Sequence, residues 1–283
     1  MLYEIYLDAI RNKEKRILNF KDSDQDKIES EALSRWIKYN PLAKQCISAG
    51  VDSSWNKRIF QGFDIYIVNA VSVTSDNIIL ERKWENNLGV TRSNYLEDKA
   101  LTMEAIVTDD SADVVDIVSV DGSLIPRFVK NRQSLTSQIV NIVKRHDNIV
   151  FISKTSDSRA QFCTLNSKAG DIYYFNRIGK SAGYSTPFEN KEYLACHSLI
   201  EVYARLRDGT PMLKIEICGR TKRSIESDIK ELLRMLSYHS VAGYPYCLKL
   251  AHKYCKVSND DVNRLVNIYG FTNEIGSRDV LGE

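Results

Sequence analysis

The sequence lacks the motifs and segments that mark several large classes of protein. It has no G-x-x-x-x-G-K-[ST] segment, which disfavours an ATP-driven motor of the P-loop type. No G-x-G-x-x-G is present, so a dinucleotide-binding enzyme has no support. No stretch approaches about 18 consecutive apolar residues, and the first residues do not look like a secretory signal. We therefore expect a soluble, cytoplasmic protein that has no membrane partner.

Paired cysteines are also missing. The chain contains six cysteines and no C-x-x-C pair; they are Cys46, Cys163, Cys196, Cys218, Cys247 and Cys255. Zinc-ribbon spacing is therefore absent, which disfavours a structural zinc site. Buried free thiols are the expectation, although a disulfide stays open if the source is a hyperthermophile.

Charge is distributed unevenly along the chain. The net charge of +2 is too small to establish a nucleic-acid partner. However, Glu97–Asp121 holds eight acids and one base, whereas Arg127–Arg159 holds seven bases and two acids. This order suits a metal cluster beside a phosphate-binding surface, and alternating solvated faces explain it equally well. Further bases that could join such a surface are Arg220, Lys222 and Arg223.

Hydrophobic periodicity predicts a mixed α/β protein. Residues 1–45 read as an N-terminal helical arm, in which a helix over 24–39 stops before Pro41, and residues 46–283 read as one domain. Expected strands cover 46–51, 63–73, 77–82, 114–120, 149–153, 172–175, 199–206 and 212–218, and 155–170 is expected to be a loop. Expected helices cover 94–107, 134–145, 224–239 and a final region from Tyr246. The order predicts a central mixed sheet flanked by helices, with N-terminal and C-terminal helical elaborations.

Two aspartates follow apolar runs that read as buried strands. Asp52 follows the run 46–51, and Asp121 follows the run 114–120. Glu104 falls in the helix expected between them. If the two strands are neighbours, three carboxylates can hold Mg²⁺ or Mn²⁺, which prefer hard oxygen ligands. The plainer interpretation is that Asp and Ser begin turns after strands.

Two further stretches carry candidate functional groups. In Gly243–His252, proline keeps the Tyr-Pro segment extended, so a helix starts near Tyr246 and places His252 about two turns in. This histidine can bind metal or move a proton, or it can be a structural residue. After the strand 149–153, Lys154 and Arg159 can contact a phosphate, or can belong to a solvated loop.

In order and spacing these blocks resemble the NurA nuclease family. The resemblance rests on residues 49–54, Glu104, residues 118–124 followed by 152–154, and the C-terminal block that ends at His252. It spans roughly residues 46–256. The chain departs from the family pattern at Ser53, where the family usually has glycine after the first aspartate.

The resemblance implies a ribonuclease H-like core and a Mn²⁺-dependent deoxyribonuclease, with Mg²⁺ as the alternative cation. It implies 5′ to 3′ exonuclease activity, with endonuclease activity as an additional mode, in resection of DNA double-strand breaks. It also implies a homodimer that docks on a hexameric translocase of the HerA type. Carried over by position, the metal ligands are Asp52, Glu104, Asp121 and His252. Tyr244 joins them as a catalytic residue, and Lys154 and Arg159 contact DNA.

Two alternatives stay open. The first is a non-catalytic DNA-binding adaptor subunit of the translocase complex, which would bind DNA without cutting it. The second is a different ribonuclease H-like enzyme, such as one that cleaves RNA. The clustered carboxylates argue against the adaptor, because a protein that only binds DNA has no physical need for them.

Overall fold

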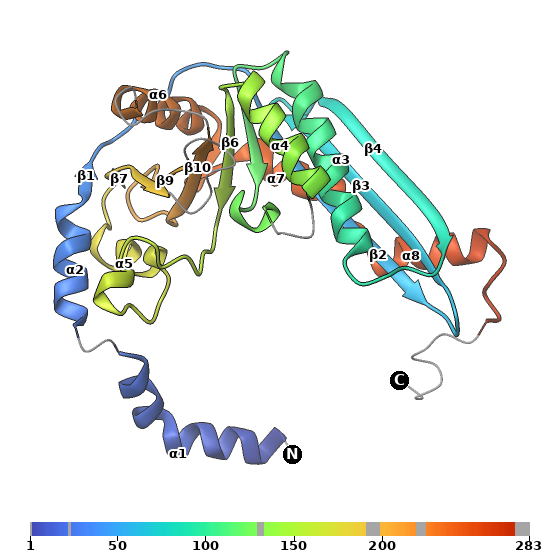
Figure 1. The fold of residues 1–283 in the computed structure, drawn as a ribbon, viewed down its shortest axis with the longest axis horizontal. Helices are drawn as coiled ribbons and strands as arrows, with labels where there is room; N and C mark the ends of the chain where they lie inside the picture. The colour runs from blue at the N-terminus through green and yellow to red at the C-terminus, as the bar shows by residue number, and fades with distance from the viewer. Residues whose placement is uncertain (1, 22–23, 129–132, 191–198, 219–224, 275–283) are drawn as a thin grey trace.

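The molecule is built on one large mixed sheet with helices on both faces (Figure 1). The computed structural model describes residues 2–21, 24–128, 133–190, 199–218 and 225–274. The predicted mixed α/β architecture, with a central mixed sheet flanked by helices, is confirmed. Among the described helices, none has the length and apolar character that crossing a membrane requires.

The sheet has a parallel centre with antiparallel strands on both sides. Its order is β1 (Trp36–Lys38), β7 (Gly183–Ser185), β9 (Leu199–Arg205), β10 (Leu213–Cys218), β6 (Ile149–Ser153), β5 (Ile117–Asp121), β2 (Ser48–Ile59), β3 (Asp64–Thr74) and β4 (Ile79–Gly89), and β8 (Phe188–Asn190) pairs with β9. Strand β5 runs parallel to both β2 and β6, and the other pairs are antiparallel. Parallel strands are covered on both faces, which is why β5 and β6 are nearly continuous apolar runs.

Helices cover the two faces of the sheet. The helices are α1 (Leu2–Phe20), α2 (Gln25–Ser34), α3 (Tyr95–Ala112), α4 (Gln133–Arg145), α5 (Asp171–Ile178), α6 (Ile225–Tyr238), α7 (Tyr246–Cys255) and α8 (Asn259–Ile268). Short elements complete the chain: 3₁₀ turns Ile125–Arg127 and Cys163–Leu165, and the pair β11 (Ser240–Val241) and β12 (Tyr244–Pro245). In Figure 1, α3 and α4 lie in front of the sheet and α7 lies behind it.

Side-chain alternation along β2 assigns its residues to these two faces. Val51 joins the apolar cluster with α3 and α4, together with Val120 of β5. Gly50 and Asp52 therefore face α7, and Gly50 lies directly under the backbone of Cys247. A Cβ on Gly50 would stand 2.3 Å from the Cys247 carbonyl carbon, so glycine is what allows α7 to approach the sheet this closely.

Strand β2 is longer than its sequence pattern indicates. The expected strand 46–51 ends where the apolar run ends, yet β2 continues to Ile59 and pairs with β3 from Ala49 to Ile59. What ends near Asp52 is the pairing with β5, because the register closes at Val51 and Val120. The polar residues that follow mark the loss of one neighbouring strand. They do not mark a turn.

Two assignments near the N-terminal side of the sheet are wrong. Residues 172–175, expected as a strand, form helix α5, because Tyr174 and Phe175 pack with Ile28 and Ala32 of α2. The helix expected over 24–39 stops at Ser34, and Trp36–Lys38 forms β1 against β7. In both places tertiary packing overrides the local preference of the sequence.

The first helix contacts the rest of the described fold at its C-terminal end, where Lys168 Nζ donates to the Asn19 carbonyl at 2.7 Å. Helix α1 has no buried residue and extends away from the body (Figure 1), whereas α2 packs against α5. The division of the chain after residue 45 stays a prediction. The described residues do not include the candidate DNA-binding bases Arg220, Lys222 and Arg223. They also do not include Ser224, the first residue of the expected helix 224–239. The segment 179–183 has G-x-S-x-G spacing, but it joins helix α5 to strand β7, and a nucleophile elbow needs a strand before a helix.

Candidate active site

The two predicted aspartates lie side by side at the end of β5. The parallel register pairs Val51 with Val120, so the next residues, Asp52 and Asp121, are neighbours on the α7 face. Asp52 is 9% exposed. Burial, and then the negative charge of Asp121, raise the pKa of Asp52. Two carboxylates placed this close favour a cation between or beside them.

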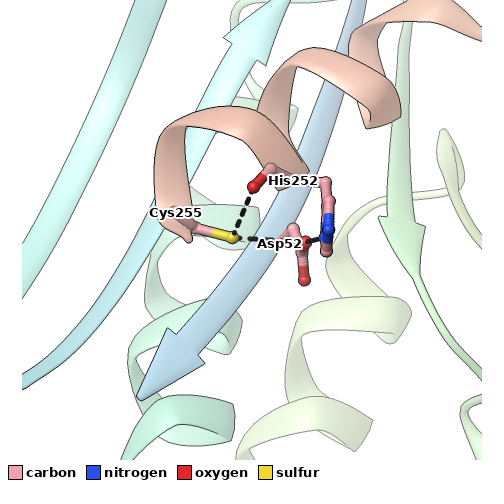
Figure 2. Close-up of side chains that lie close together, drawn as sticks. All are labelled: Asp52, His252 and Cys255. Carbon is pink, nitrogen blue, oxygen red and sulfur yellow. Dashed lines mark hydrogen bonds and ion pairs between the residues drawn. The ribbon is translucent and has the colours of Figure 1, made fainter. Parts of the chain in front are cut away.

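Helix α7 brings two side chains onto Asp52. Figure 2 shows His252 and Cys255 extending from α7 toward the carboxylate on β2. The Nδ1 atom of His252 lies 3.0 Å from Asp52 Oδ2, and the Cys255 thiol donates to the same oxygen at 3.2 Å. The other oxygen, Oδ1, accepts the backbone N–H of Ser53 at 2.8 Å. Residues three apart share one face of a helix, which is why both side chains meet Asp52.

Asp121 is contacted by two residues that the sequence singled out. The Tyr244 hydroxyl donates to Asp121 Oδ1 at 3.1 Å, and Lys154 Nζ lies 3.4 Å from Oδ2. The Lys154 ammonium also sits 4.5 Å from the centre of the Tyr244 ring. Burial, and then the charge of Asp121, raise the pKa of Tyr244. The hydroxyl therefore keeps its proton and remains a hydrogen-bond donor at neutral pH.

Glu104 reaches the same region from the opposite face of the sheet. It lies in α3, is 3% exposed, and its Oε2 accepts the Ser53 hydroxyl at 2.8 Å. Its Oε1 forms an ion pair with Arg127. Burial raises the pKa of Glu104, while the Arg127 charge opposes that rise. The Ser53 hydroxyl thus joins the Asp52 strand to Glu104.

Arg127 is a functional candidate that sequence reasoning missed. Its Nη2 donates to the Asp121 carbonyl at 2.7 Å, and its Nε donates to the Ser123 carbonyl at 3.1 Å. It therefore fixes the turn after β5, where Gly122 has a φ of +91°. The available signal was its position four residues after Ser123, at the start of the basic segment. Pairing with a glutamate 23 residues upstream cannot be read from that spacing.

A second missed group holds the same turn from the sheet side. The Glu216 carboxylate accepts the Ser123 hydroxyl at 2.7 Å and also the Leu124 N–H. Lys214, which is 1% exposed, lies 2.6 Å from Glu216 and 3.0 Å from Glu201. These two residues carry charge inside the apolar strand β10. That unusual placement was the signal that could have found them.

The carboxylates open into a cleft of about 1520 Å³. Asp52 and Asp121 lie on its wall, Lys154 lines it beside Asp121, and Arg159 lines it as well. Arg159 Nη1 donates to the Ser167 carbonyl at 3.2 Å, so its guanidinium is tied to the loop 155–170. This segment is the irregular loop that the sequence predicts, apart from the short turn Cys163–Leu165. Both predicted DNA-contacting bases therefore border the cleft that holds the acids.

The donor atoms at this site fit a divalent cation. Within the described part of the chain, the group of potential ligands that lies within 4.8 Å is Asp52, His252 and Cys255. Asp121 is the next residue along the sheet edge, whereas Glu104 is held by Arg127. Asp52, Asp121 and His252 therefore lie together on the α7 face of the sheet. Glu104 lies on the α3 face.

Known proteins resemble this chain over most of its length. The family profile described as the NurA domain matches residues 47–257. A protein from Sulfurisphaera tokodaii named DNA double-strand break repair nuclease NurA is 22% identical over 94% of this chain and 95% of its own length. A protein of the same name from Saccharolobus solfataricus is 23% identical over 93% of this chain and 92% of its own length.

Solved structures show the same fold. The crystal structure of the NurA nuclease from Sulfolobus solfataricus superposes with a TM-score of 0.79 at 20% identity, covering 95% of this chain and 97% of that one. A crystal structure of NurA bound to dAMP and manganese has a TM-score of 0.65 at 12% identity, covering 92% and 96%. Because the profile covers well over half of the chain, including the acids and α7, the chain belongs to the NurA family.

Proposed function

We propose that this chain is a metal-dependent DNA nuclease that resects DNA ends at double-strand breaks, with Mn²⁺ as its cation and Mg²⁺ as the alternative. The observation that carries the proposal is the pair Asp52 and Asp121, which lies on the wall of a cleft that Lys154 and Arg159 also line. The names of the relatives support it, as does the NurA structure that holds manganese and dAMP.

Asp52, Asp121 and His252 would hold the cation, and Glu104 would join them if Arg127 releases it. When bound, such a cation activates water for attack at phosphorus and stabilises the departing oxygen. The carboxylates supply the oxygen ligands that Mn²⁺ prefers, and an exposed His252 imidazole suits the open side of the site. The position of Asp121 depends on Arg127 and Glu216, which hold the turn that follows it.

The remaining groups would handle the DNA. Tyr244 has a protonated hydroxyl at Asp121, from which it can donate to a phosphate oxygen. Lys154 carries a positive charge at the same carboxylate, where it would attract the phosphodiester. Arg159 borders the cleft at the loop and would contact the strand further from the acids. We place 5′ to 3′ polarity, with endonuclease activity as a second mode, in this proposal as well.

The central experiment is a cleavage assay on end-labelled DNA with Mn²⁺, Mg²⁺ or EDTA. Outer-shell partners of a metal typically contribute 10–100-fold, so we expect Asp121→Asn and Asp52→Asn to lose more than about 100-fold. Lys83→Met, which removes a base that does not line the cleft from an exposed ion pair, is the control. Unchanged cleavage in both aspartate variants would overturn the site. Binding without cleavage by the wild type would favour the adaptor, and faster cleavage of RNA would favour a ribonuclease.

We also propose a homodimer that works with a hexameric translocase of the HerA type. Support comes from α1, which exposes apolar side chains such as Tyr6, Ile10 and Leu18 and has no buried residue. Light scattering on the full chain tests the dimer. Co-elution with the translocase, before and after removal of residues 1–21, tests the docking role of the arm. Equal co-elution of the shortened chain would exclude α1 as the docking element.

A further inference from the structure

The Asp52, His252 and Cys255 group has an unusual mixture of donor atoms. It offers a carboxylate oxygen, an imidazole nitrogen and a sulfur, all within 4.8 Å of one another. Mn²⁺ and Mg²⁺ are hard cations that favour oxygen, whereas sulfur and imidazole together suit softer cations such as Zn²⁺. The cysteine therefore changes which cation the site prefers.

The spacing of the three atoms fits a small tetrahedral cation. In a zinc site with bonds of about 2.0–2.3 Å, neighbouring ligand atoms stand roughly 3.3–3.7 Å apart. Here His252 Nδ1 and Cys255 Sγ lie 3.0 Å and 3.2 Å from Asp52 Oδ2. These two separations are a few tenths of an ångström shorter than in such a site, and the third, between Nδ1 and Sγ, is below 4.8 Å. Three protein ligands leave the fourth position to water, as in zinc sites that stay open to solvent.

The surrounding fold holds this geometry in advance. Cys255 is 1% exposed and Asp52 is 9% exposed, whereas the His252 ring is open to solvent. The close contact of Gly50 with the backbone of Cys247 keeps α7 against β2. The thiol already points at the carboxylate, so little conformational freedom is lost when a cation replaces the thiol proton.

We infer that Asp52, His252 and Cys255 form a zinc-class cation site, and that its occupation excludes the hard cation used in cleavage. On binding, the Cys255 thiol releases its proton to solvent, the hydrogen bond to Asp52 is lost and a metal–sulfur bond forms. Zn²⁺ and Co²⁺ both bind to sites of this kind more tightly than Mn²⁺ does. The inference that zinc binds here depends on the geometry of the three side chains. The inference that bound zinc inhibits cleavage rests on the proposed nuclease function.

Cobalt provides a direct probe because a cobalt–thiolate bond absorbs in the near ultraviolet. The full chain, stripped with a chelator, is titrated with Co²⁺ and then with Zn²⁺. We expect a charge-transfer band that Zn²⁺ abolishes, and we expect its loss in Cys255→Ser and in Asp52→Asn. Cys163→Ser is the matched control because Cys163 is an exposed thiol, the kind most open to adventitious metal. That variant keeps the band.

Folding of each variant is checked by thermal unfolding. If Cys255→Ser does not fold, Cys255→Ala and X-ray absorption of the zinc-loaded wild type replace it, with a sulfur neighbour expected at about 2.3 Å. A band that persists in Cys255→Ser, or zinc with only nitrogen and oxygen neighbours, would overturn the inference.

Cleavage gives a separate readout. Zn²⁺ should inhibit Mn²⁺-supported cleavage of the wild type, and loss of the sulfur ligand should raise the inhibitory zinc concentration by about 10–100-fold. If the sulfur band forms but no cation supports cleavage, the zinc site stands and the nuclease proposal fails. If cleavage occurs without any sulfur band, the nuclease proposal stands and the zinc site fails.

Discussion

Arg127 and Glu104 form an ion pair in which the two side chains are only 7% and 3% exposed. The pair lies on the α3 face of the sheet, opposite Asp52, and Arg127 continues from it to the main chain of Asp121. One guanidinium therefore neutralises a buried acid and fixes the end of β5. This double role connects the stability of the core to the position of a candidate catalytic carboxylate.

Replacing Arg127 with methionine should destabilise the protein. The substitution leaves Glu104 buried without its partner, which typically costs about 3–5 kcal/mol. The control is Lys83→Met, which breaks a pair with Asp110 that is 43% and 42% exposed. Exposed pairs contribute about 0–1 kcal/mol. Urea unfolding of both variants measures the difference, and equal losses would show that Arg127 is not needed to neutralise Glu104.

Replacing Tyr244 with phenylalanine should slow cleavage more than it weakens DNA binding. The variant keeps the ring beside Lys154 but removes the hydroxyl that donates to Asp121. We expect kcat to fall by about 10–100-fold, as for other partners of a metal ligand, with KM little changed. Tyr254→Phe removes a hydroxyl that donates to Asn77 at 2.9 Å on the surface, so it should leave kcat unchanged. A similar kcat loss in both variants would argue against a specific role.

Replacing Gly50 with alanine should displace α7 from β2. The added Cβ would stand 2.3–2.5 Å from three backbone atoms of Cys247 and Leu248, so the helix must shift. Overpacking of this kind costs about 1–3 kcal/mol, and the shift should weaken cation binding as well. Gly62→Ala is the control: its φ of +109° imposes strain, but no atom lies within 4 Å. Calorimetric titration with Mn²⁺ should detect weaker binding in the Gly50 variant only.

Replacing Asp171 with asparagine should reduce the dependence of stability on pH. Asp171 is fully buried, and burial raises its pKa to about 7. In the unfolded chain the same group titrates near pH 3.9, about the model-peptide value. Its stabilising contribution is therefore complete below about pH 4 and is lost as pH rises through about 7. Urea unfolding across this range should show a flatter profile for the variant, and parallel profiles would contradict the assignment.

The strand and the helix that hold the main site residues could be predicted from the sequence because their patterns are local. The apolar run before Asp121 predicts β5, and the Tyr-Pro step predicts the start of α7 at Tyr246. These two patterns place an acid and His252 on defined elements. The meeting of Asp52 with His252 across 200 residues follows only once α7 is packed on β2.

Other parts could not be read from local patterns. Arg127 binds a glutamate from another element, and Cys255 reads as an ordinary buried residue until its thiol is seen at Asp52. The aromatic segment 172–175 has the composition of a strand, yet it forms a helix whose Tyr174 and Phe175 pack with α2. In each case the deciding contact joins residues far apart in the chain.

The cleft is bounded by two kinds of structure. Strand ends carry Asp52 and Asp121, whereas the loop 155–170 and the short β8 supply much of the remaining lining. Loops accept insertions and substitutions more readily than packed strands do. Engineering or natural divergence can therefore reshape the fit to a DNA strand through the loop alone, while the chemistry at the sheet edge is inherited unaltered.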